Sequence, residues 1–482
     1  MSGAASIEAR VHAAARLLAL DALERRDQLI DTVAQEYPAL PDARSFAADA
    51  RAVMALDPAA AALLAEAWLV SGLRRPRARY EAALGAKPVA LRGEARPVRA
   101  VVPQVVTEAN GARREALLHA NEQRLRDARD AARDVVDATR RATSALDPAL
   151  VDALLPRDVD DDALAETEDL WRELDARVLR ALELDPARVR WGDRLRSLLA
   201  PSVSTQVQPA TWSALAVGWW ERVGIEGALR GVRDALAASS REGTGVHVLV
   251  TEPGARATLA GRPAPTGWDA GEVLGAGSVA AGAVLARGLW SAHRRGVDRA
   301  ADGALHALGR RLLHERTFLQ RAAQVDAVPR ERVMIEALHG ELARVRLDAV
   351  LARFTRDALD RAPNLGPRFV EGVTRAWGVA PPPGWAVHFA ADALASGAPL
   401  GVAWGRRAVG SRVEVALRAR LRERFDEDWH RNPRTGEWLR GALDAVRALG
   451  GPAWLEAEGV DVSAGALARR LAEDFDAARR PR

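Results

Sequence analysis

Apolar residues recur at three- and four-residue spacing along most of this chain, which is the pattern of helices that bury one face. The spacing is clear in Ile7–Gln35 and Ser45–Gly72. One run, His247–Val250, instead has the apolar and β-branched character of a strand. The pattern therefore predicts a mainly α-helical fold with a small β element near His247–Val250. The further predicted helices are Asn110–Leu146, Asp161–Leu184, Ala187–Leu199, Trp212–Ser240, Gly271–Arg294, Arg299–Gln324, Arg330–Arg361, Pro367–Trp377, Val387–Ala395, Gly405–Asp426, Thr435–Leu449 and Ala464–Ala478.

A segment rich in proline, glycine and arginine, Leu73–Ala100, interrupts the helical pattern. It carries eight basic residues against two acidic ones, Glu81 and Glu94. We interpret it as a linker between an N-terminal helical region, residues 1–100, and a larger helical domain, residues 101–482. Clustered arginines also bind the phosphates of nucleic acid, but Tyr80 is the only aromatic residue among them, so a nucleic-acid partner is not expected. A contact between this segment and an acidic partner stays open.

The amino-acid composition excludes several classes of protein and of functional site. The 48% apolar content indicates a globular protein. The absence of cysteine excludes disulfides, thiolate nucleophiles and cysteine-ligated metals. The N-terminal stretch lacks the uninterrupted apolar run of a secretory signal, and the clearest uncharged apolar run, Val273–Ala286, is too short to span a bilayer. We expect a soluble, cytoplasmic protein without a membrane partner.

Five segments follow one another in a recognisable order. In Ala416–Leu443, a helix ends near Phe425, a Trp-bearing connection follows, and the next helix opens with Arg-Thr-Gly-Glu-Trp-Leu. Together, and in their order along the chain, this segment and four earlier ones resemble helical gluzincin zinc metallopeptidases of the oligoendopeptidase F and thimet oligopeptidase type. The resemblance implies a two-lobed helical architecture around a deep substrate channel. The other four segments are Arg113–Val136, Leu170–Pro201, Gly224–Val250 and Leu274–Leu289.

The zinc ligands of that family have no counterpart in this sequence. The family binds zinc through the two histidines of an HExxH helix and a glutamate of the following helix, and the glutamate of HExxH activates the bound water. Here Ala257–Val273 contains no histidine, and Ala281 falls at the position of the glutamate ligand. The only tyrosines, Tyr37 and Tyr80, lie far before the family's oxyanion-stabilising tyrosine. The resemblance thus implies that the zinc-helix segment is deleted around residues 251–273, with no catalytic residue, no metal ligand and no cofactor.

A replacement metal site is not expected elsewhere. His314–Phe318 begins like HExxH but ends in phenylalanine. His306 and His314 lie eight residues apart, about two helical turns, which places them on one helix face without completing a ligand set.

We therefore expect a catalytically inactive homologue, a pseudopeptidase that binds a peptide or protein or acts as a scaffold subunit, with an active homologue as one candidate partner. Two alternatives stay open: an active hydrolase with a non-standard site, and a helical scaffold with an acidic partner. The residues expected to line the degenerate groove are His247, Trp268, Ser278 and Ala281.

Two structural expectations follow for the region of the deletion. Ala260–Val273 should form a loop, because its two prolines and three glycines oppose a helix. Val273–Leu289 should be a buried structural helix, because its glycines at 275, 277, 282 and 288 allow another backbone to approach closely. Ala281 should then lie against a neighbouring helix.

Overall fold

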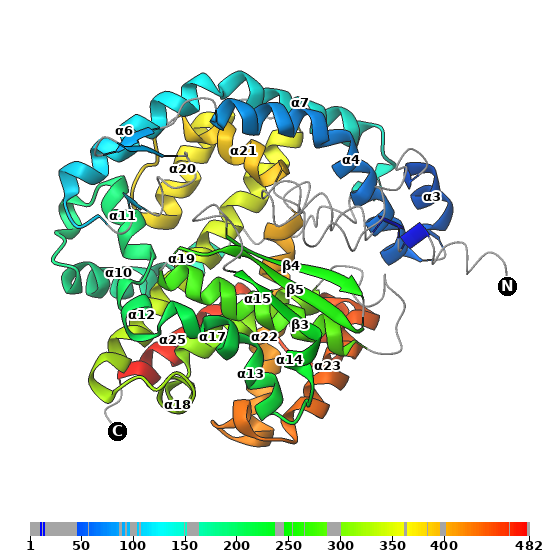
Figure 1. Cartoon of the computed structure of the whole chain (residues 1–482), viewed down its shortest axis with the longest axis vertical. Coiled ribbons are helices and arrows are strands. Elements are labelled where there is room, and N and C mark those ends of the chain that lie inside the picture. The colour runs from blue at the N-terminus through cyan, green and yellow to red at the C-terminus, as the bar shows by residue number, and fades with distance from the viewer. Residues whose placement is uncertain are drawn as a thin grey trace.

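Helices form most of the computed structural model, and an arc of them stands over a second group, with a small sheet between the two (Figure 1). This confirms the mainly helical fold with a small β element. The structure describes residues 10–11, 13–14 and 46–479, except for 56, 86–88, 92–93, 97–103, 106–107, 149, 152–162, 237–244, 253, 265, 287–299, 361–363, 383, 396–401 and 462. None of the helices within these ranges combines the length and apolarity that crossing a bilayer requires.

The arc is built on α7, which packs against α4 on one side and α21 on the other. α6 leads into α7 with a break of one residue at Ala128, so the single helix predicted over Asn110–Leu146 is two helices. Asn110 caps α6 by accepting a hydrogen bond from the backbone N–H of Arg113. The elements of the arc are α3 (Phe46–Val53), α4 (Pro58–Gly85), β1 (Val89–Leu91), β2 (Glu94–Arg96), α6 (Gly111–Asp127), α7 (Arg129–Ser144), α20 (Leu365–Trp377) and α21 (Trp385–Ala395).

The second group centres on α15, which packs against α13 and α17 and against the sheet. The long helix α19 runs from this group into the arc and contacts α22 and α25 as well as α20 and α21 (Figure 1). The helices of the second group are α9 (Ala163–Glu166), α10 (Glu168–Ala181), α11 (Trp191–Leu198), α12 (Pro201–Gln206), α13 (Trp212–Arg222), α14 (Ala228–Gly231), α15 (Gly267–Leu285), α17 (Ala300–Arg311), α18 (Arg316–Arg321), α19 (Ala327–Leu359), α22 (Val402–Phe425), α23 (Thr435–Leu449), α24 (Gly451–Ala457) and α25 (Ala464–Arg479). Four short 3₁₀ turns, η2 (Pro186–Arg188), η3 (Pro209–Thr211), η5 (Leu312–His314) and η7 (Trp429–Arg431), complete it.

The sheet beside α15 has three strands in the order β3–β5–β4. β3 (Val232–Ala235) pairs in parallel with β5 (Arg256–Arg262), and β4 (Gly245–Glu252) pairs antiparallel with β5. β4 contains the predicted strand His247–Val250. β5 leads within a few residues into α15.

Two predictions about the chain's organisation are wrong. The predicted linker Leu73–Ala100 begins inside α4, which continues to Gly85, and the hairpin of β1 and β2 follows. The helix predicted over Trp212–Ser240 ends at Arg222, because Gly224 and Gly227 adopt positive φ angles of 90° and 81°. The chain then forms α14 and β3.

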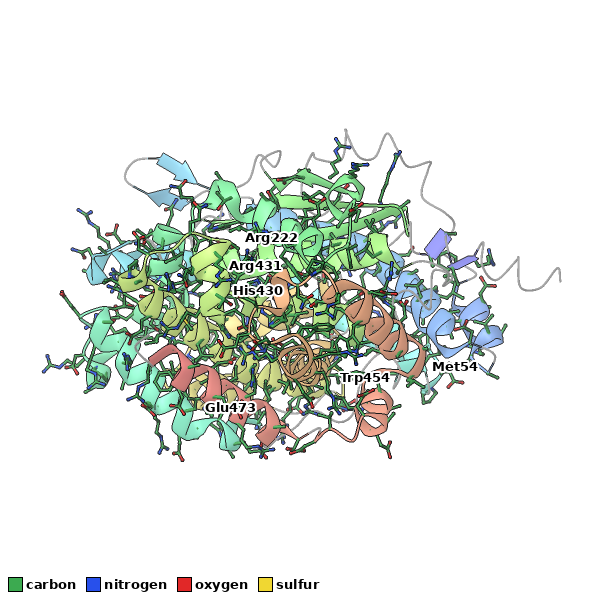
Figure 2. The ribbon with its side chains drawn as sticks, turned by 90° about the horizontal axis from the view of Figure 1, so that it is seen from below. Met54, Arg222, His430, Arg431, Trp454 and Glu473 are labelled. Carbon is green, nitrogen blue, oxygen red and sulfur yellow. The ribbon has the colours of Figure 1, made fainter. Side chains whose placement is uncertain are left out.

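The end of α13 packs against η7. Trp219 on α13 meets Trp429 of η7 edge to face, with ring centroids 5.8 Å apart. Figure 2 shows Arg222, His430 and Arg431 close together at this junction. Burial and the neighbouring charge of Arg431 lower the pKa of Arg222.

The predicted loop Ala260–Val273 is also wrong in most of its length. Its first residues belong to β5 and its last seven to α15, so only a short turn joins strand and helix. β5 is the central strand of the sheet, with Ala257, Thr258, Leu259 and Ala260 all at most 5% exposed. A strand buried on both faces shows no apolar–polar alternation.

Candidate functional site

Helix α15 occupies the place where the sequence predicted a degenerate zinc site, and its glycines lie in contact with neighbouring helices. A β-carbon added to Gly275 would lie 2.7 Å from the backbone oxygen of His306 on α17. One added to Gly277 would overlap the side chain of Ala216 on α13, and one added to Gly282 would overlap Leu305 on α17. The helix is therefore held by backbone-level packing on two sides.

The four predicted groove residues lie in three different environments. Ser278 and Ala281 are fully buried within the packing of α15, with 0% exposed surface. Ser278 donates to the backbone oxygen of Leu274 at 2.9 Å and accepts from Nε1 of Trp219 at 3.2 Å. Most residues of Val273–Leu285 are buried, which confirms a buried helix over this part of the predicted range; residues 287–289 lie outside the described ranges.

Trp268 and His247 complete that set. Trp268 is half-buried in the first turn of α15, and the guanidinium of Arg344 lies 3.6 Å from its ring centroid. The backbone of His247, in β4, pairs with that of Ala260 in β5, and the side chain of His247 lies outside the described atoms. The structure thus brings Ser278 and Ala281 onto one helix, one turn apart, and leaves Trp268 at the opposite end of that helix.

A pair of ionisable side chains that the sequence analysis did not predict joins α15 to α17. The carboxylate of Glu272 is ion-paired with Arg344, and its Oε2 lies 3.5 Å from Nε2 of His306. Arg310 donates to Nδ1 of His306 at 2.7 Å. Burial raises the pKa of Glu272, but Arg344 and His306 outweigh this effect and hold it well below its usual range. Burial lowers the pKa of His306, so the pair is a carboxylate beside a neutral imidazole.

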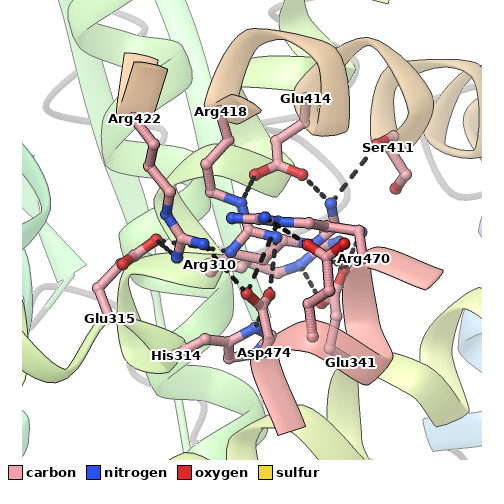
Figure 3. A network of polar contacts seen from close by, with 12 residues as sticks. Arg310, His314, Glu315, Glu341, Ser411, Glu414, Arg418, Arg422, Arg470 and Asp474 are labelled. Carbon is pink, nitrogen blue, oxygen red and sulfur yellow. Dashed lines mark hydrogen bonds and ion pairs between the residues drawn. The ribbon is translucent and has the colours of Figure 1, made fainter. Parts of the chain in front are cut away.

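This pair borders a larger network of buried charges. Arg310 forms two hydrogen bonds, of 2.9 and 2.8 Å, with the carboxylate of Glu341 on α19. Arg311 joins Glu341 to Glu414 on α22, and Arg418 joins Glu414 to Asp474 on α25 (Figure 3). These charged side chains are at most 4% exposed. The network therefore fastens four helices through charge-assisted hydrogen bonds.

Neither the pair of Glu272 and His306 nor the buried charge network has the features of a metal site or a substrate pocket. Among the described residues, no three histidine, aspartate or glutamate side chains are grouped so that they could hold a metal. His306 lies with Glu272, whereas Nδ1 of His314 lies 3.8 Å from Asp474, so the two histidines serve different clusters. The cavity beside Arg344 measures ≈ 20 Å³, which is room for about one water molecule.

The carboxyl group of Asp348, on α19, should make stability depend on pH. It is 6% exposed and lies 3.4 Å from Arg407. Burial raises its pKa to about 6, and Arg407 only partly offsets this. The folded chain therefore keeps a proton that the unfolded chain releases, so this group's contribution is complete below about pH 4 and is lost as the pH rises through 6.

Asp348→Asn removes that titration while keeping the shape of the side chain. From pH 4 to pH 7 the variant should gain about 2–3 kcal/mol relative to the wild type, as measured by urea unfolding at each pH. A stability difference that stays constant over this range would contradict the prediction.

Comparison with known proteins agrees with the architecture. Searches found no matching family model and no matching curated protein. Among solved structures, a protein named for oligoendopeptidase F from Bacillus anthracis str. Ames has a TM-score of 0.55 at 10% identity and covers 90% of this chain and 77% of its own. A second structure named for oligoendopeptidase F has a TM-score of 0.57 at 11% identity, covering 90% and 82%. PZ peptidase A, solved with an inhibitor, has a TM-score of 0.57 at 9% identity, covering 96% and 86%. The chain therefore shares the helical oligoendopeptidase F fold.

Proposed function

We propose that this protein is a catalytically inactive relative of the helical zinc metallopeptidases and acts as a scaffold or a peptide-binding subunit. The main support is α15, the helix that follows the sheet, which contains no histidine and is packed shut by glycine and alanine. The sequence also lacks any pair of histidines separated by three residues. A gluzincin site needs that pair on one helix to place both imidazoles on one metal.

The pair of Glu272 and His306 supports a second candidate, a hydrolase with a non-standard site. A general base needs a free lone pair or a raised pKa. Here Arg344 neutralises Glu272, and Arg310 donates to His306, whose other nitrogen faces Glu272. Both groups are held by partners in the resting structure, so we favour the non-catalytic function.

The proposal predicts that purified protein carries no stoichiometric zinc and cleaves no peptides. Zinc would be measured by elemental analysis after mild dialysis, and cleavage by mass spectrometry of a mixed peptide library incubated with and without added zinc. We expect zinc far below one equivalent per chain and no cleavage in either sample, because α15 carries no histidine and Ala281, at the expected ligand position, is fully buried and has no donor atom.

Three variants make the test specific. His306→Ala and His314→Ala remove the histidines of the two buried clusters, and His119→Ala removes an exposed histidine on α6 as a control. About one equivalent of zinc that is lost in His306→Ala or His314→Ala, but kept in His119→Ala, would overturn the proposal. Cleavage abolished by His306→Ala alone would favour the non-standard hydrolase.

A further inference from the structure

A pocket of ≈ 350 Å³ lies in the arc, away from α15 and the buried charge network. We call it the α7–α21 pocket. One face of α7 forms its first wall, and Phe354 of α19, the start of α20 and the start of α21 form the others. Its volume is within the range of pockets that hold small ligands. None of its lining residues belongs to α15 or α17, so the inference does not depend on the proposed function.

The floor of the α7–α21 pocket is apolar. Val136, Phe354, Ala386 and Ala390 are each at most 6% exposed, so they form a solid base rather than loose surface. The half-buried Leu365 and Val387 extend this apolar surface toward the opening. Such a floor fits a hydrocarbon or another apolar group.

The rim is basic. Arg129, Arg133 and Arg140 recur on one face of α7 against a single carboxylate in the lining, Asp137. Arg140 is tied down, because its Nε donates to the backbone oxygen of Ala358 at 2.6 Å and its Nη1 lies 3.1 Å from Asp137.

The other two arginines are more available. Arg129 is exposed, and Arg133 is 54% exposed with only a long contact of 3.4 Å to Asp130 at the surface. An exposed ion pair of this kind is weak and easily exchanged. The pocket therefore combines an apolar floor with two arginines that are able to bind an anion.

We propose that the α7–α21 pocket binds a small amphipathic carboxylate, such as a medium-chain fatty acid. The apolar body lies on Val136 and Phe354, and the carboxylate accepts hydrogen bonds from Arg129 and Arg133. Guanidinium groups match the two oxygens of a carboxylate, and this pairing gives selectivity for an acid over an alcohol of equal length.

Titration calorimetry with decanoate, below its micelle concentration, tests the proposal, with decanol as the uncharged probe. Decanoate should bind one site per chain, and decanol at least about ten-fold more weakly, because it lacks the charge-assisted hydrogen bonds. The double variant Arg129→Ala/Arg133→Ala should weaken decanoate binding by about ten-fold or more. Arg141→Ala, an exposed arginine of α7 outside the lining, should leave it unchanged.

A blocking variant separates this pocket from any other decanoate site. Gly366 lines the pocket, and a β-carbon there would meet nothing within 4 Å, so Gly366→Leu should fill the space and abolish binding. Its melting temperature checks that the variant folds. No binding by the wild type, equal binding of decanol and decanoate, or full binding by the folded Gly366→Leu variant would each overturn the proposal.

Discussion

Replacing Glu414 with alanine should destabilise the folded protein by roughly 3–5 kcal/mol. Glu414 on α22 is fully buried and ion-paired with Arg311 and Arg418, which are themselves 0% and 1% exposed (Figure 3). Its removal takes the shared carboxylate from two buried guanidinium groups. Arg311 keeps Glu341 and Arg418 keeps Asp474, but the buried cluster loses one negative charge, which is far costlier than the loss of a surface pair. Urea unfolding at pH 7, followed by tryptophan fluorescence, measures the change.

Glu423→Ala is the matched control for this prediction. Glu423 lies on the same helix, is 70% exposed and pairs with Arg420 at 3.0 Å. Its loss should change stability by less than about 1 kcal/mol, because exposed ion pairs contribute little. If Glu414→Ala costs no more than Glu423→Ala, the four helices do not depend on this network.

Replacing Ala281 with glutamate should destabilise the folded protein by about 4 kcal/mol or more. The alanine has no exposed surface, and even a β-carbon added to the adjacent Gly282 would overlap Leu305, so a longer side chain has to displace its neighbours. The new carboxylate also has to be buried, ionised or neutral, at a substantial cost. Thermal and urea unfolding measure the loss.

The matched control for Ala281→Glu is a glutamate at a less buried position of the same helix. Ala283→Glu places the same group two residues away at a half-buried position of α15, and it should cost clearly less. A large loss at Ala281 alone would favour a scaffold over a protein that binds peptides in the family's groove. If Ala281→Glu kept its stability and bound zinc once an HExxH helix was grafted in, an open groove and the peptide-binding role would be supported.

The sequence predicted long amphipathic helices well, because their apolar spacing directly reflects one buried face. It predicted β4 for a similar reason, since Val248 to Val250 are typical strand residues. It missed β5, whose Arg-Ala-Thr-Leu-Ala-Gly-Arg sequence has neither strong strand propensity nor alternation. It also missed the end of α4, where Pro76 is accommodated inside a helix. In both cases tertiary packing outweighs local preference.

The site was predictable in one respect and not in another. The glycines of α15 predicted close helix packing, because glycine within a helix is unfavourable unless a neighbouring helix packs closely against it. The buried charges gave no comparable signal. Arg311, Glu341 and Glu414 each lie on a helix of mixed composition, and only the fold shows that they face inward toward one another. A sequence pattern of arginine and glutamate on a helix is the same whether those side chains are buried or face solvent.

The glycine contacts of α15 also make a return to metal chemistry hard to reach by single substitutions. A zinc site along this helix would need two imidazoles, and each is far bulkier than the glycines or alanines it would replace. The first imidazole would disrupt the packing of α13 and α17 before a second ligand existed to hold a metal. A lineage changing one residue at a time would have to pass through unstable intermediates. An engineer seeking to restore zinc would have to redesign three helices together.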